Sequence, residues 1–146
     1  MNIQTALKKG QSILKGNNIS SAQLDSEILM SKAIGKDKKF LILNLNQLIT
    51  KKNFDYFNFL IQERAKSKPI AYLKKKKDFW KYEFVINEDV LIPRPDTEIL
   101  VEQVLKLTKN RSRLKILDIG IGSGCILMSI LKEKKDYLGT GIDISN

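Results

Sequence analysis

The chain has 146 residues, of which 42% are hydrophobic, enough for one ordinary domain or two small ones, and no apolar stretch is long enough to span a membrane. One cysteine and no histidine exclude an internal disulfide and leave almost no means of building a metal site from these residues. The net charge is +10, which can attract an acidic partner such as RNA. The polar N-terminus lacks the apolar block of a signal peptide, so we expect a cytoplasmic protein.

Residues 1–69 are predicted to form a small bundle of four short helices, because their apolar residues recur at the three-to-four spacing of an amphipathic helix. Gly35 is expected to end the second helix, Thr50 to cap the start of the last one, and Pro69 to end it. The side chains expected to be buried are Ile3, Ala6, Leu7, Ile13 and Leu14, then Leu24, Ile28, Leu29 and Ala33, then Phe54, Phe57, Leu60, Ile61 and Ala65.

Over residues 70–93 the pattern changes to aromatic and β-branched residues that partly alternate with polar ones, which is typical of strands. We expect an antiparallel hairpin with strands at 72–79 and 83–86 and a turn near Lys81. The lysine run at 74–77 resembles a nucleic-acid patch, but a charged strand edge that discourages pairing with other chains is the simpler interpretation.

Residues 94–146 are predicted to begin an α/β domain. Pro93 and Pro95 hold the chain extended before a helix that Asp96 or Thr97 caps. The buried side of this helix is expected to carry Ile99, Leu100, Val104 and Leu107. A continuous apolar strand (LKILDIG), a helix (CILMSILKEK) and a second strand (YLGTGID) follow, which indicates a β-α-β unit with a right-handed crossover and a buried parallel sheet.

Three glycines, Gly120, Gly122 and Gly124, separate the first strand from the helix, an order typical of nucleotide-binding sites. Without a Cβ the backbone can turn sharply and a cofactor can approach it, while the helix directs its free N–H groups at the same place. Asp143 ends the second strand, where its carboxylate can accept hydrogen bonds from ribose hydroxyls. Asp118 lies at the top of the first strand, where it can orient the loop or contact a cationic ligand group.

The spacing of the glycines distinguishes between cofactors. A dinucleotide loop needs G-x-G-x-x-G, whose third glycine would stand at Cys125, and no Gly-Lys-Ser/Thr follows as in a P-loop. The G-x-G-x-G found here suits S-adenosylmethionine, which has no pyrophosphate to seat on the helix. The alternative is a glycine loop that only packs a helix on a sheet. The residues predicted to bind the cofactor are Gly120, Ile121, Gly122, Ser123, Gly124 and Asp143.

Longer motifs resemble a known family. The segment DFWKYEFVINEDVLIPRPDTEILVE (78–102), followed by ILDIGIGSGCILMSIL and GIDIS, is similar to the HemK/PrmC family of glutamine N5-methyltransferases. RAKSKPIAYL (64–73) also resembles the family's Arg…Pro-x-x-Tyr segment, and the helical N-terminal region resembles its small substrate-recruiting domain. The resemblance implies methyl transfer from S-adenosylmethionine to the side-chain amide of the glutamine in the Gly-Gly-Gln motif of peptide chain release factors.

The resemblance also implies roles for single residues. It places residues 120–124 at the methionine end of the cofactor and Asp143 at the ribose. For Arg94 the alternative is a surface ion pair with Asp96 or Glu98. The resemblance places Arg94, Pro95, Thr97 and Glu98 beside the reaction pocket, and Asp118 is also expected to be adjacent to the pocket.

The sequence departs from the family pattern in two ways. Lys68 and Lys74 stand where family members usually have glycine, which bears on the geometry of the hairpin. The family's Asn-Pro-Pro-Tyr motif, whose Asn and neighbouring carbonyl bind the target amide, does not occur in these 146 residues. A methyltransferase sheet of this class also has more than two parallel strands. We therefore expect an incomplete domain that contains no catalytic residue of its own and has no transferase activity alone.

The expected fold class is thus α/β: a helical substrate-recruiting bundle at 1–69, a β-hairpin linker at 70–93, and the start of a Rossmann-like, S-adenosylmethionine-dependent methyltransferase domain at 94–146. The expected partner is a release factor, with no membrane and no nucleic acid, and the complete protein is expected to be a monomer. Two alternatives stay open: a fragment of an RNA-directed methyltransferase, favoured by the charge of +10, and a release-factor-binding remnant without catalysis. Against RNA, 22 of the 26 basic residues are lysines, as AT-rich codon usage produces, and VLIPRPDTE favours the glutamine methyltransferases.

Overall fold

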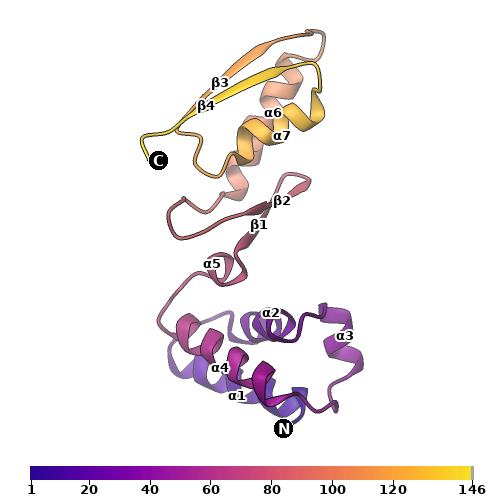
Figure 1. Cartoon of the computed structure of the whole chain (residues 1–146), viewed down its shortest axis with the longest axis vertical. Helices are drawn as coiled ribbons and strands as arrows, with labels where there is room; N and C mark the ends of the chain where they lie inside the picture. The colour runs from indigo at the N-terminus through magenta and orange to yellow at the C-terminus, as the bar shows by residue number, and fades with distance from the viewer. Residues whose placement is uncertain (146) are drawn as a thin grey trace. The chain divides into compact units, whose positions relative to one another are not determined.

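The computed structural model describes residues 1–145, which fall into two compact units, Met1–Lys74 and the residues from Lys75 onward (Figure 1). Each unit has a hydrophobic cluster of its own. The first unit is helical, with one isolated bridge between Asn2 and Leu48, and the strands of the described residues all lie in the second. The predicted mixture of helices followed by small sheets is therefore confirmed.

The first unit packs three longer helices against one another and adds two short ones. Residues 1–69 contain the four helices that the sequence predicted, and the fifth follows at residues 70–74. Helices α1, α2 and α4 are in mutual contact, and α3 and α5 both pack against α2 (Figure 1). The helices are α1 (Ile3–Gly16), α2 (Ala22–Ile34), α3 (Lys38–Leu43), α4 (Lys51–Ala65) and α5 (Ile70–Lys74).

Residues with the expected capping chemistry define several helix ends. The Thr50 hydroxyl accepts a hydrogen bond from the N–H of Asn53 at 3.2 Å and caps α4, as predicted. Gly35 ends α2 in the left-handed region, with a φ of 67°, also as predicted. Asp37 caps α3 through the N–H of Phe40 at 2.7 Å. Local side-chain chemistry therefore fixes where these helices begin and end.

Residues 70–74 form α5, so the prediction of a strand beginning at residue 72 is wrong. The carbonyl of Pro69 accepts hydrogen bonds from the N–H groups of Tyr72 and Leu73, and proline has a φ that suits the start of a helix. Leu73 is 6% exposed and belongs to the core of the first unit. Pro69 thus precedes a new helix instead of ending α4, which stops at Ala65.

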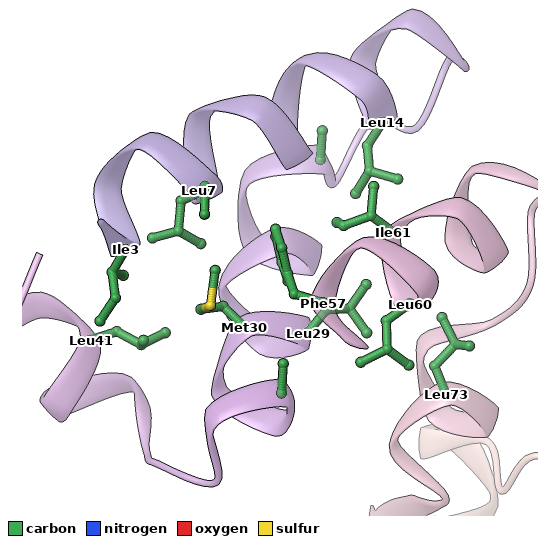
Figure 2. Packing of buried hydrophobic residues seen from close by; sticks show 13 residues of the cluster. Ile3, Leu7, Leu14, Leu29, Met30, Leu41, Phe57, Leu60, Ile61 and Leu73 are labelled. Carbon is green, nitrogen blue, oxygen red and sulfur yellow. The ribbon is translucent and has the colours of Figure 1, made fainter. Parts of the chain in front are cut away.

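The core of the first unit is built around Phe57 of α4, which is fully buried. Figure 2 shows side chains from α1, α2 and α4 turned toward a common interior that contains this ring. Gly10 of α1 lies against Phe57, because a Cβ built on Gly10 would stand 2.7 Å from the Phe57 Cζ and 3.0 Å from the Ile61 Cδ1. Gly10 therefore permits the close approach of α1 to α4.

Helix α2 presents a different face to the core from the one predicted. Leu24 is 50% exposed, whereas Ser26 and Met30 are fully buried. At 100° per residue Leu24 lies on the opposite side of the helix from Ser26, Leu29 and Met30. The apolar pattern alone favoured a stripe through Leu24, because it gave no weight to a serine on the buried face.

A buried ion pair joins α2 to α4. The Nε of Arg64 donates to the Asp25 carboxylate at 2.7 Å, and the Ser21 hydroxyl donates to the same carboxylate oxygen at 2.8 Å. Arg64 also donates through Nη1 to the carbonyl of Lys68 at 3.1 Å. Asp25 is only 4% exposed, so its charge is compensated almost entirely by protein groups.

The second unit contains an antiparallel hairpin, two helices and a pair of parallel strands. Thr97 occupies the N-cap position of α6, as expected, but its side chain makes no capping hydrogen bond. The elements are β1 (Lys76–Phe79), β2 (Tyr82–Val85), a 3-10 turn η1 (Pro95–Thr97), α6 (Glu98–Leu107), β3 (Lys115–Ile119), α7 (Cys125–Glu133) and β4 (Leu138–Ile142).

Helix α6 buries a narrower face than predicted. Val101 is fully buried, and Val104 and Leu105 pack against the core that also contains Phe79 and Cys125. The prediction that the buried side carries Ile99, Leu100 and Leu107 is wrong, because these side chains are 60%, 49% and 77% exposed. Helix α6 packs mainly against α7, so only one line of its residues is buried.

The pair β3–β4 is covered on one face by α6 and α7 and is open on the other within the described residues (Figure 1). On the covered face a Cβ at Gly139 would lie 2.7 Å from the Leu131 Cδ1, so the strand lies close against α7 there. The open face is apolar and carries Leu117, Ile119, Leu138 and Ile142, which are 57%, 74%, 66% and 48% exposed. Within residues 1–145 the parallel strands are therefore covered on one face only.

Replacing Gly10 by Val is expected to lower the free energy of unfolding of the first unit by about 2 kcal/mol, because the added methyl groups overlap the Phe57 ring. Gly16→Val is the matched control, since a Cβ at Gly16 meets nothing within 4 Å. Urea unfolding followed by far-ultraviolet circular dichroism measures both effects. Equal midpoints for the two variants would contradict the close contact between α1 and α4.

Replacing Arg64 by Met is expected to destabilise the first unit by about 3 kcal/mol, because it leaves the Asp25 carboxylate buried without its cation. The control is Lys66→Met, which breaks the ion pair between Lys66 and Glu63, whose lysine side chain is 72% exposed. This change is expected to lower the free energy of unfolding by at most about 0.5 kcal/mol. Chemical denaturation of both variants checks the difference. If Arg64→Met lost no more stability than the control, the result would contradict a structural role for the Arg64–Asp25 pair.

Candidate functional site

The glycine loop, residues 120–124, leaves β3 through a set of main-chain hydrogen bonds. The carbonyl of Ile142 accepts from the N–H groups of Gly120 at 2.8 Å and Ile121 at 3.1 Å, and the Gly124 N–H donates to the Ile121 carbonyl at 2.8 Å. The φ angles of Gly120, Gly122 and Gly124 are 79°, 51° and 74°. Residues with a Cβ rarely adopt this region, so the path of the loop accounts for all three glycines.

The Asp143 carboxylate is bonded to the loop. Its Oδ2 accepts the N–H of Gly122 at 2.9 Å, and its Oδ1 accepts the N–H and the hydroxyl of Ser145 at 3.1 and 3.0 Å. These bonds, the one from Gly122 first, lower the pKa of Asp143, so the group is ionised at neutral pH. A carboxylate has about four acceptor positions and these bonds use three of them, so Asp143 can still accept one hydroxyl of a ligand.

Two hollows have Gly120 as a common lining residue. The first, which we call the Asp143 hollow, has a volume of about 400 Å³ and is lined by Ile119, Gly120, Ile142, Asp143 and Ile144. The second, the Arg94 hollow, has a volume of about 130 Å³ and is lined by residues 91–94, Thr97, 120–123, Cys125 and Ile126. A Cβ built on Gly120 meets no atom within 4 Å, so the glycine keeps the space above the backbone clear.

The structure brings some of the predicted pocket residues to the glycine loop and leaves others away from it. Arg94 and Thr97 line the Arg94 hollow, whereas Pro95 and Glu98 line neither of the two hollows. Asp118 lies instead in a third hollow on the covered side of β3, beside α6 and α7. Its Oδ2 is buried and has no hydrogen-bond partner within residues 1–145.

Arg94 does not form the surface ion pair that the sequence left open. Among the described residues neither Asp96 nor Glu98 pairs with it, and the Glu98 Oε1 instead accepts the N–H of Trp80 at 2.9 Å. Arg94 is exposed and is the one charged residue among those that line its hollow. Its guanidinium group is therefore available to an anionic ligand group.

The residues that anchor the hairpin beside this site were not predicted. Glu133, at the end of α7, accepts from the Trp80 Nε1 at 3.0 Å and the Tyr82 hydroxyl at 3.5 Å, and pairs with the Lys81 Nζ at 2.7 Å. The Lys81 ammonium lowers the pKa of Glu133, and the carboxylate raises the pKa of Lys81. Glu133 lies more than fifty positions from Tyr82, so spacing in the sequence gives no signal for this contact.

The arrangement can hold a ligand with hydroxyl groups at one end and an anionic group at the other. No group of three metal-binding side chains occurs within residues 1–145. Over the same residues no helix is both long and apolar enough to cross a membrane. Near the glycine loop the described residues offer main-chain N–H groups, one carboxylate and one guanidinium.

Comparison with known proteins agrees with this organisation. Residues 5–74 match the family described as the PrmC N-terminal domain. A protein named release factor glutamine methyltransferase from Buchnera aphidicola subsp. Baizongia pistaciae is 42% identical over 143 residues, which cover 98% of this chain and 51% of the relative. A protein of the same name from Leptospira interrogans is 42% identical over 144 residues, which cover 98% of this chain and 50% of the relative.

A protein named bifunctional methyltransferase from Rickettsia felis is 34% identical over 170 residues, which cover 98% of this chain and 32% of the relative. The chain thus spans about half the length of the release factor glutamine methyltransferases it matches. Because both its helical N-terminal unit and the residues beyond it match these proteins, the chain belongs to the release factor glutamine methyltransferase family and corresponds to the N-terminal portion of its members.

Proposed function

We propose that this chain forms the cofactor-binding and substrate-recruiting part of a release factor glutamine methyltransferase. The observation that carries the proposal is the Asp143 carboxylate bonded to the glycine loop, whose Gly120 lines two hollows. The names of the relatives supply the class of reaction and substrate. Residues 1–69 would recruit the release factor, 70–93 would link the units, and 94–146 would hold the cofactor.

The residues present fit S-adenosylmethionine. Asp143 is ionised and has about one acceptor position left for a ribose hydroxyl. Gly120 leaves open the space in which the cofactor would cross from one hollow to the other, and Gly122 keeps Asp143 in place through its N–H. The cofactor supplies a methyl group on a positively charged sulfur, which makes that methyl group electrophilic.

The proposed acceptor is the side-chain amide of the glutamine in the Gly-Gly-Gln motif of a release factor. An amide nitrogen is a weak nucleophile, so the transfer depends on holding it in line with the methyl group and on stabilising the charge that develops on it. In the family an Asn-Pro-Pro-Tyr segment does this, and it does not occur in these 146 residues. The contribution of the described residues is therefore the cofactor site and the docking of the substrate.

S-adenosylmethionine is expected to bind the 146-residue chain at one site, and Asp143→Ala is expected to weaken this binding at least about tenfold, because the ribose loses a charged acceptor. Calorimetry measures both affinities. The matched control is Asp136→Ala, which also removes an aspartate that accepts a main-chain N–H, from Arg113 at 2.8 Å, but lines neither hollow.

The control variant should bind as the unchanged chain does. Circular dichroism of each sample establishes that it is folded before titration. A folded chain that binds no S-adenosylmethionine, or an Asp143→Ala variant that binds as tightly as the Asp136→Ala control, contradicts the proposed cofactor site.

The 146 residues on their own are expected to transfer no methyl group to a release factor, because the segment that would bind the target amide is not among them. Incubation with a release factor and S-adenosylmethionine labelled in its methyl group, followed by mass spectrometry of the Gly-Gly-Gln peptide, measures this. A full-length relative assayed in parallel is the positive control. Turnover comparable to that of the relative would show that the described residues already contain a target site.

A further inference from the structure

We propose that Arg94 binds the α-carboxylate of the amino-acid end of S-adenosylmethionine and so fixes the direction in which the cofactor lies across the glycine loop. This inference rests on the proposed function and assigns a specific ligand group to a residue of the same site.

The Arg94 hollow carries a single charge. Its wall consists of apolar side chains from Leu91 to Pro93 and from Ile121 and Ile126, with the hydroxyls of Thr97 and Ser123 as the polar side-chain groups. A guanidinium in such surroundings forms strong bonds with a carboxylate, because it presents two parallel N–H donors to the two oxygens. An uncharged or cationic ligand group would not use these donors.

The position of Arg94 is fixed by its main chain. Pro95, which follows it, restricts the backbone and starts η1, and the carbonyl of Arg94 accepts the Thr97 N–H at 3.1 Å. The carboxylate of Glu98, which lies at the start of α6, is already bonded to the N–H of Trp80. The backbone at Arg94 is therefore ordered before any ligand arrives, while its guanidinium group has no acidic partner among the described residues.

The two hollows have opposite charges. Asp143 is the one charged residue that lines its hollow, and Arg94 is the one that lines the other, with Gly120 common to both. The carboxylate of the cofactor reaches a cationic lining residue in one direction only, because the Asp143 hollow has none. In the reverse direction Asp143 could pair with the ammonium of the amino-acid end, but the carboxylate would have no cation. Arg94 thus favours the direction that brings the carboxylate into its own hollow.

Calorimetry with three probes tests the inference: S-adenosylmethionine, decarboxylated S-adenosylmethionine, which lacks only the carboxylate, and 5′-methylthioadenosine, which lacks the whole amino-acid end. The variant is Arg94→Gln, and the matched control is Arg111→Gln, an exposed arginine of the same unit that lines neither hollow. Arg94→Gln is expected to weaken S-adenosylmethionine roughly 10-fold to 100-fold, the range of a hydrogen bond to a charged group. Arg94→Gln should change the affinity for the other two probes less than about twofold, and Arg111→Gln should leave the affinity for all three probes unchanged.

Each other outcome has a distinct meaning. An equal loss of affinity for all three probes would show that Arg94 shapes the hollow without contacting the carboxylate. No loss of affinity for S-adenosylmethionine would show that Arg94 does not contact the cofactor. Either result overturns the inference and leaves the proposed cofactor intact. Suppose that the unchanged, folded chain binds 5′-methylthioadenosine, and that the Arg94→Gln variant prefers S-adenosylmethionine over its decarboxylated form as strongly as the unchanged chain does. Then the inference alone fails. If the unchanged chain binds none of the three probes, the proposed cofactor site fails and the assignment of Arg94 fails with it.

Discussion

The carbonyl of Ile142 accepts the N–H groups of both Gly120 and Ile121, and the geometry of the candidate site depends on these two bonds. They continue the parallel pairing of β3 with β4 past the end of the regular strand and turn the chain toward α7. Asp143, the next residue after Ile142, then reaches the N–H of Gly122. One short segment of β4 thus holds the loop from both its main chain and its side chain.

The hairpin is attached to this assembly by packing as well as by hydrogen bonds. Phe79, at the end of β1, is buried in the same cluster as Cys125, the first residue of α7. Glu98 and Glu133 bind the turn at Trp80 from two different helices. The segment between the hairpin and α6 lines the Arg94 hollow, so its position is determined at one end by the Phe79 core and at the other by the start of α6.

The features that sequence could predict are those set by neighbouring residues. Gly35, Thr50 and the three glycines of the loop each have a backbone or capping requirement that few residue types meet, and the structure confirms the geometry expected of them. The buried faces of α2 and α6 were misjudged because burial depends on which neighbours a helix meets. Leu24 and Leu107 fit a helical period as well as their buried neighbours do.

The contacts of the candidate site likewise divide into those that neighbouring residues determine and those between distant parts of the chain. The glycine loop and Asp143 follow from the order of strand, loop, helix and strand, which local patterns indicate. The partners of Trp80 and Glu98 and the surroundings of Asp118 depend on distant parts of the chain, and a single sequence carries no record of such contacts. The role of Glu98 as an acceptor for a turn 18 positions earlier therefore emerges only from the structure.

The hydrogen-bonded indole at the hairpin turn has a spectroscopic consequence. Trp80 is the single tryptophan of the chain and lies in the second unit, whereas the longer helices α1, α2 and α4 all lie in the first. Tryptophan emission therefore reports on the second unit, and far-ultraviolet ellipticity reports mainly on the first. The two signals together distinguish one cooperative transition from two separate ones, without any label added to the protein.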